Sequence, residues 1–64
     1  MEFKEELKMI RSRLSMTRAQ LAVALGCSEP LIARLEIGKR LPSFEIKKRV
    51  IRLCEDRDID RNLF

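Results

Sequence analysis

The segment from Thr17 to Gly38 restricts the fold more than any other stretch, because two glycines divide it at regular intervals. One short apolar run ends at Gly26, and a second run of similar length ends at Gly38. Glycine readily adopts the left-handed backbone that ends many helices. Thr17, with Gln20 three residues later, matches a capping box, and Ser28 is a good N-cap for a second helix. The segment therefore predicts two short helices joined by a tight turn at Gly26.

The second of these helices is predicted over about residues 28–37, with one buried and one exposed face. Ile32 and Leu35 are three positions apart and are expected to face inward. Pro30 lies in the first turn, where its missing N–H is not needed for a helical hydrogen bond. This arrangement leaves the N-terminal half of the helix exposed, as in helices that enter a DNA major groove.

The flanking segments are also predicted to be helical. Residues 2–14 carry one apolar stripe at helical spacing, formed by Phe3, Leu7, Ile10 and Leu14. A further helix is expected over about residues 44–55, after Pro42 and with Ser43 as its N-cap. Its inward face is expected to contain Ile46, Val50, Leu53 and Cys54, flanked by Phe44 and Ile51.

The end of the chain is compatible with a short fifth helix or turn, with Asp58 as its cap and Ile59, Leu63 and Phe64 within it. No segment alternates between apolar and polar residues with period two. We therefore predict an all-α fold, a compact bundle of four to five short helices in one domain, residues 1–64.

The composition excludes several classes of function. The 64 residues include no histidine and only two cysteines, Cys27 and Cys54, so neither a zinc site nor the commonest acid–base catalyst is expected. No Gly-rich phosphate loop is present, and we predict neither an enzyme nor a cofactor. The chain lacks a signal peptide and a membrane-spanning run, which predicts a cytoplasmic protein. The net charge of +4 weakly favours an anionic partner.

At its central segment the chain resembles the phage-repressor and Cro-like helix-turn-helix family (XRE type). The matching residues are Arg11, Arg18, Leu21, Ala22, Gly26, Ser28, Ile32, Leu35, Glu36, Gly38, Lys39, Arg40, Pro42 and Ser43. The resemblance covers about residues 3–55. It implies a lambda-repressor-like domain that binds double-stranded DNA, usually as a dimer, with the motif at 17–38. It also implies a partly buried ion pair between Arg11 and Glu36, the alternative being two solvated charges.

The positions expected to face DNA bases are Ser28, Glu29, Pro30, Ala33 and Arg34. Arg34 is the best candidate reader, because a guanidinium can bond guanine O6 and N7 together. The alternative is that Arg34 is solvated or pairs locally with Glu29 or Glu36. Pro30 and Ala33 have no donors and can contact only thymine methyls. Glu29 either accepts a hydrogen bond from cytosine N4 or simply complements the helix dipole and is repelled by phosphates.

The residues expected to contact DNA phosphates are Thr17, Arg18, Lys39, Arg40 and Ser43. They lie at the start of the first motif helix, in the basic loop after the second, and at the start of the following helix. Such contacts fix the register of a protein on DNA without reading its sequence. The run Lys47-Lys48-Arg49 is more consistent with a solvated face than with a DNA contact.

These observations favour a sequence-specific DNA-binding transcription regulator, most simply a Cro-like repressor of a phage or mobile element. A palindromic operator and a homodimer on DNA are expected, with Ile59, Leu63 and Phe64 as candidate dimer contacts. The alternative for these three residues is packing against the core. The competing function is a protein-interaction module, such as an antitoxin-like protein, which uses the exposed apolar residues Pro30, Leu31, Ala33 and Ile37. No small-molecule ligand is expected.

Overall fold

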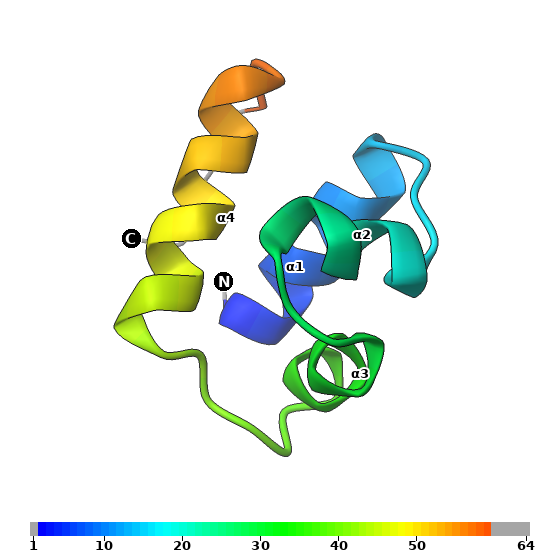
Figure 1. Ribbon diagram of the computed structural model, residues 1–64, viewed down its shortest axis with the longest axis vertical. Helices are drawn as coiled ribbons and strands as arrows, with labels where there is room; N and C mark the ends of the chain where they lie inside the picture. Colours follow the sequence, from blue (N-terminus) through cyan, green and yellow to red (C-terminus); the bar gives the residue numbers. More distant parts are fainter. Residues whose placement is uncertain (1, 60–64) are drawn as a thin grey trace.

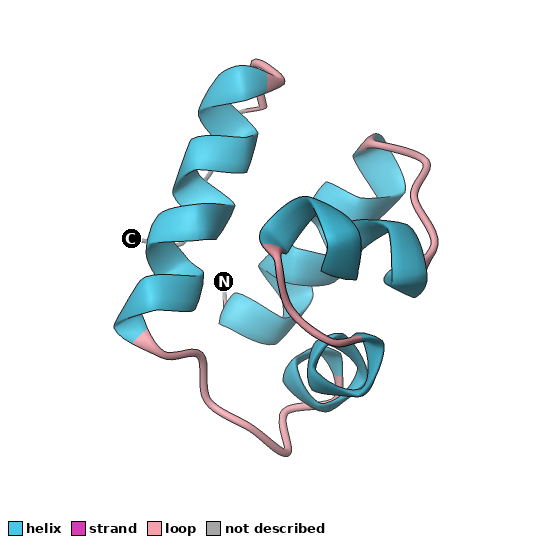
Figure 2. Ribbon diagram, in the orientation of Figure 1, coloured by secondary structure: helices cyan, strands magenta, loops and turns pink. Residues whose placement is uncertain are grey.

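A computed structural model describes residues 2–59 and contains four helices within that range. They are α1 (Phe3–Arg13), α2 (Arg18–Leu25), α3 (Glu29–Glu36) and α4 (Phe44–Asp56). The described part of the chain contains no strand (Figure 2), so the predicted all-α fold is confirmed. The predicted bounds of the first and fourth helices differ from the observed ones by one residue. No helix within residues 2–59 is long and apolar enough to cross a membrane.

Local capping accounts for the N-termini of α2, α3 and α4 and for the end of α2. Thr17 Oγ1 accepts a hydrogen bond from the Gln20 N–H at 3.1 Å, and Gln20 Oε1 accepts one from the Thr17 N–H at 2.8 Å, which completes the predicted capping box. Ser28 and Ser43 each accept from the backbone N–H three residues later, at 3.3 and 3.2 Å. Gly26 ends α2 with a φ of 69°, in the left-handed region that favours glycine.

Figure 1 shows how the helices are arranged in space. The view runs nearly along the axis of α3, whereas α2 lies across it, so the two motif helices meet at a steep angle. Both α1 and α2 pack against α3, and α4 packs against α2. Residues 37–43 lead from the end of α3 to the start of α4 (Figure 1). The motif pair is thus supported by the two outer helices.

The core contains apolar side chains from all four helices. Its buried members are Leu7, Ile10, Leu21, Ala22, Leu25, Ile32, Leu35, Ile46, Val50 and Cys54. Each large side chain among them contributes about 1.5–3 kcal/mol by leaving water. Phe3, Leu14 and Leu53, which were also expected to face inward, are only partly buried at the edge of this core, and Phe44 is exposed. Neither cysteine forms a disulfide.

Asp58 does not cap a new helix, contrary to one of the predictions. Its φ of 57° is left-handed, whereas an N-cap has an extended backbone. The Asp58 and Ile59 N–H groups instead bond to the Glu55 and Cys54 carbonyls, which ends α4. Ile59 packs against the core, the alternative considered for a dimer contact. Leu63 and Phe64 lie outside the described residues.

Glu6 is a feature that the sequence did not indicate. Its side chain is completely buried in α1, next to Leu7 and one turn before Ile10. Neither carboxylate oxygen has a hydrogen-bond partner among residues 2–59. The neighbouring Glu5 is exposed, as expected of an acidic residue in a first helical turn. Burial of an unpaired carboxylate opposes folding, because the group loses its hydration without compensation.

Candidate nucleic-acid interface

The C-terminal end of α3 is attached to α1 through the buried Glu36. Arg11 Nε donates to Glu36 Oε2 at 2.7 Å, and Arg11 Nη2 donates to Glu36 Oε1 at 3.1 Å. This two-point geometry matches the planar guanidinium to the carboxylate. Arg11 Nη1 also donates to the Met16 carbonyl at 3.3 Å, which connects the pair to the segment before α2. The ion pair implied by the resemblance is therefore present and buried on the carboxylate side.

Arg18 is a second partner of the same carboxylate. Its Nε donates to Glu36 Oε1 at 3.1 Å, and its side chain remains 43% exposed. Burial alone raises the pKa of Glu36, but the hydrogen bonds from Arg11 and Arg18 outweigh it, and the pKa lies below its usual value. The hydrogen bond to Glu36 in turn raises the pKa of Arg11. We call Arg11, Arg18 and Glu36 the Glu36 cluster; it joins α1, α2 and α3.

The first turn and the outer face of α3 are accessible, and Arg34 lies in the last turn of the helix. Ser28, Glu29, Pro30 and Arg34 are exposed, and Ala33 is partly buried. Arg34 makes no ion pair with Glu29 or Glu36 within the described structure, since Glu36 is occupied by the other two arginines. The guanidinium of Arg34 therefore remains available for a partner outside the chain.

The residues expected to contact phosphates are exposed as well. Thr17 and Arg18 begin α2, Lys39 and Arg40 follow α3, and Ser43 precedes α4. The N–H groups of Lys39 and Arg40 bond to the Arg34 carbonyl, which folds the start of the basic loop back onto α3. Cationic side chains beside helix N-termini can bind anions, because backbone N–H groups there add positive potential.

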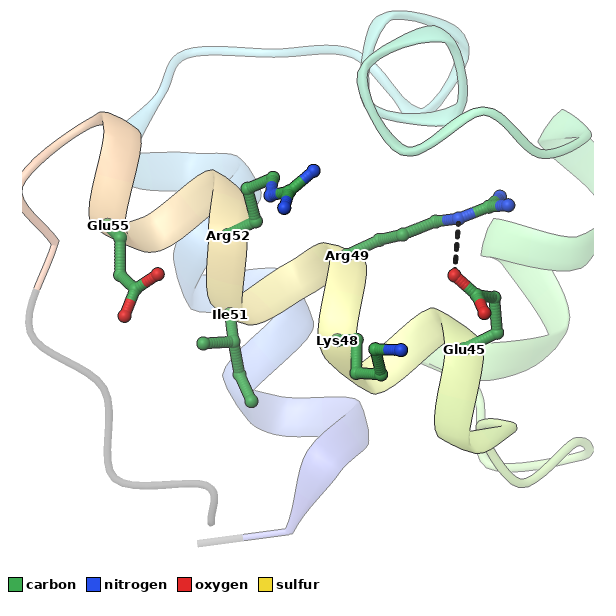
Figure 3. Close-up of a pocket in the computed structure, with 6 residues that line it drawn as sticks. All are labelled: Glu45, Lys48, Arg49, Ile51, Arg52 and Glu55. Atoms are coloured by element: carbon green, nitrogen blue, oxygen red, sulfur yellow. Dashed lines mark ion pairs between the residues drawn. The ribbon is translucent and has the colours of Figure 1, made fainter.

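Arg49 is exposed, as expected for this face of α4, but it also contacts the end of α2. Its Nη1 donates to the carbonyls of Leu25 and Gly26, at 3.1 and 3.2 Å. Its Nε lies 3.5 Å from a carboxylate oxygen of Glu45, one turn earlier on the same helix. In Figure 3 the side chain extends away from α4, and the dashed line marks the contact with Glu45. Nothing in the local sequence marks this contact, because it joins residues more than 20 positions apart.

A family model described as a helix-turn-helix domain matches residues 2–62. The chain belongs to this helix-turn-helix family. The match spans nearly the whole chain and agrees with the resemblance to phage-repressor and Cro-like proteins that the motif residues carry. No curated protein and no solved structure matches the chain. The four helices of residues 2–59, with α2 and α3 joined by a short turn, fit such a helix-turn-helix domain.

Proposed function

We propose that this helix-turn-helix protein is a sequence-specific transcription regulator that places the N-terminal half of α3 in the major groove. The observation that supports this most is the position of α3 itself. Its C-terminal end is anchored by the Glu36 cluster, whose carboxylate is buried, while Ser28, Glu29 and Arg34 at its other end and outer face are exposed. Second helices of such motifs enter the groove in this orientation.

Within this proposal, direct reading of bases depends on few donors. Arg34 bonds a guanine, for about 1–3 kcal/mol of discrimination against other bases. Ser28 and Glu29 supply polar contacts at the groove edge, and Pro30 and Ala33 contact thymine methyls. Sequence-dependent DNA shape then contributes to specificity alongside these contacts.

The proposed phosphate contacts surround the reading helix. Lys39, Arg40 and Ser43 bind the backbone on one side, and Thr17 and Arg18 bind it at the start of α2. Arg18 is well suited to this role, because its Nε is already bonded to Glu36 and its guanidinium remains partly exposed. A side chain that is held in place before binding loses less conformational entropy on binding.

The finer proposal is a Cro-like repressor that binds a palindromic operator as a homodimer. Two reading helices related by a two-fold axis lie about 34 Å apart, one turn of DNA. Ile59 packs on its own core, so any dimer contact at this end falls to Leu63 and Phe64, beyond the described residues. Sedimentation of the protein with and without its DNA checks this, and a monomer in both states excludes the dimer.

The decisive experiment is a selection of binding sites from random double-stranded DNA, followed by affinity measurements across a salt series. For four to six phosphate contacts per subunit, log affinity falls against log salt with a slope of about −0.9 for each contact. Arg34→Ala relaxes the preference at one base pair, whereas Arg40→Ala weakens binding to all duplexes alike. If Arg34→Ala instead weakens binding to all duplexes alike and Arg40→Ala relaxes the preference at one base pair, the assigned roles are wrong.

A protein-interaction module is the competing proposal, and exposed apolar side chains favour it. Ile37, Leu41 and Phe44 expose 53, 86 and 76% of their surface around the end of α3 and the following loop. Pro30 is exposed too, and Leu31 and Ala33 are partly so. Weak DNA binding without preference for any sequence supports this module instead, with a polypeptide as the principal partner.

A further inference from the structure

The contact between Arg49 and the end of α2 lies at the point that sets the direction of α3. The turn consists of Gly26, Cys27 and Ser28, and the geometry of these three residues determines the angle between the motif helices. The Gly26 N–H bonds to the Val23 carbonyl and the Cys27 N–H to the Ala22 carbonyl, so carbonyl groups of α2 accept hydrogen bonds from the N–H groups of the turn.

Arg49 donates hydrogen bonds to two carbonyl groups at the same turn. The N–H groups of the turn bond to the carbonyls of Ala22 and Val23. The carbonyls of Leu25 and Gly26, which come later in the chain, accept hydrogen bonds from Arg49 Nη1 at 3.1 and 3.2 Å. The last carbonyls of a helix lack intrahelical donors and carry partial negative charge. A guanidinium therefore satisfies both hydrogen bonding and charge at this position.

Two further contacts orient this guanidinium, although the Arg49 side chain remains 44% exposed. A Cβ atom at Gly26 would lie 3.4 Å from Arg49 Nη1, so the side chain lies directly against the glycine backbone. Glu45 holds the Nε edge from the opposite side. Residues 37–43 connect α3 to α4. The contact from Arg49 on α4 to Gly26 therefore links the start of the turn to the helix that follows α3.

We infer that Arg49 is a positioning residue for DNA recognition, which fixes the angle of α3 by holding the Leu25 and Gly26 carbonyls. This inference rests on the proposed function, in which α3 reads bases. It assigns to an α4 residue an effect on specificity that does not require Arg49 to touch DNA. Loss of the contact widens the range of α3 orientations. Sequence is read by hydrogen bonds to base edges, and these require side chains of α3 to be placed correctly in the groove.

The test compares Arg49→Met with Arg52→Met as a matched control. Both variants lose one positive charge from the same helix, but Arg52 is exposed and makes no hydrogen bond to the turn within the described structure. Each protein is titrated with the duplex selected from random DNA and with a scrambled duplex of equal length, well below its melting temperature. Arg49→Met is expected to lower the ratio of the two affinities by about tenfold, the effect of misplacing one base contact. Arg52→Met leaves that ratio unchanged.

Arg49→Lys is the rescue variant. It keeps the positive charge and one donor nitrogen, so it is expected to recover part of the ratio of the two affinities. Hydrogen exchange of the Cys27 amide, measured without DNA, is expected to quicken in Arg49→Met and not in Arg52→Met. Equal loss of affinity for both duplexes in both variants overturns the inference, since charge alone then explains it. An unchanged ratio with a lowered melting temperature also overturns it and leaves a purely structural role. If the unmodified protein prefers no duplex, the proposed function itself fails, and the positioning role fails with it.

Discussion

Glu6 and Glu36 are both fully buried carboxylates, yet their surroundings differ completely. Glu36 accepts three hydrogen bonds from Arg11 and Arg18, whereas Glu6 accepts none from the described part of the chain. A buried charge is tolerated when partners replace its lost hydration and is costly when they do not. The comparison shows that the end of α3 is held by a satisfied polar cluster, while α1 carries an unfavourable group elsewhere in the same small core.

The largest expected effect is that of Arg11→Ala. It removes two of the three hydrogen bonds to Glu36 and leaves a buried carboxylate supported by Arg18 alone. Breaking a buried pair from one side destabilises a protein strongly, here by about 2–3 kcal/mol because one partner remains. Urea unfolding measures the loss, with Arg13→Ala on the exposed side of α1 as the control. An unchanged midpoint in Arg11→Ala shows that the pair does not stabilise the fold.

Glu36 also predicts how stability depends on pH. Because its pKa in the folded protein lies below the usual value of 4.5, folding favours the ionised form. The stabilisation is fully present above that unfolded-state value and is lost as the pH falls through the lower pKa of the folded state. Thermal melts between neutral pH and acid are expected to show this loss. The Glu36→Gln variant is expected to show a shallower acid dependence, and an identical profile contradicts the assignment.

Replacement of Glu6 is expected to act in the opposite direction. Glu6→Leu removes an unpaired buried carboxylate and adds apolar surface, so it raises the free energy of unfolding by about 1–3 kcal/mol. Glu6→Gln is expected to give a smaller increase, because an unpaired amide is also costly. The matched control is Glu5→Gln, which changes an exposed neighbour and should leave the urea midpoint within error. Destabilisation by Glu6→Leu shows that the carboxylate has a favourable role.

The smallest expected effect on stability is that of Arg18→Ala. Arg18 contributes one hydrogen bond from a side chain that is 43% exposed, so solvent screening limits the loss to about 1 kcal/mol or less. Its effect on DNA affinity is expected to be larger, because the proposed phosphate contact disappears and the salt slope becomes shallower by about 0.9. A loss of stability as great as that of Arg11→Ala makes Arg18 mainly a structural residue.

Local patterns were sufficient for the helices and for the exposed face of α3. Thr17, Gly26, Ser28 and Ser43 act on residues at most four positions away, so their capping and turn roles are visible in the sequence. The ion pair between Arg11 and Glu36 could be predicted only from the family resemblance. The roles of Arg34 and the phosphate-contact residues remain predictions, since their partners lie outside the chain.

The sequence by itself determined where the helices begin and end, because caps, glycines and the period of the apolar residues act over one or two turns. Only the tertiary structure decided which charges meet. Arg18 contacts Glu36 across 18 positions, and Arg49 contacts the end of α2 across 23 and 24. Glu6 lies three residues after Phe3 and four before Ile10, so helical spacing puts it on the apolar face of α1, but only the structure shows that its acidic side chain is buried there. Such contacts depend on the angles at which helices pack, which no short-range pattern specifies.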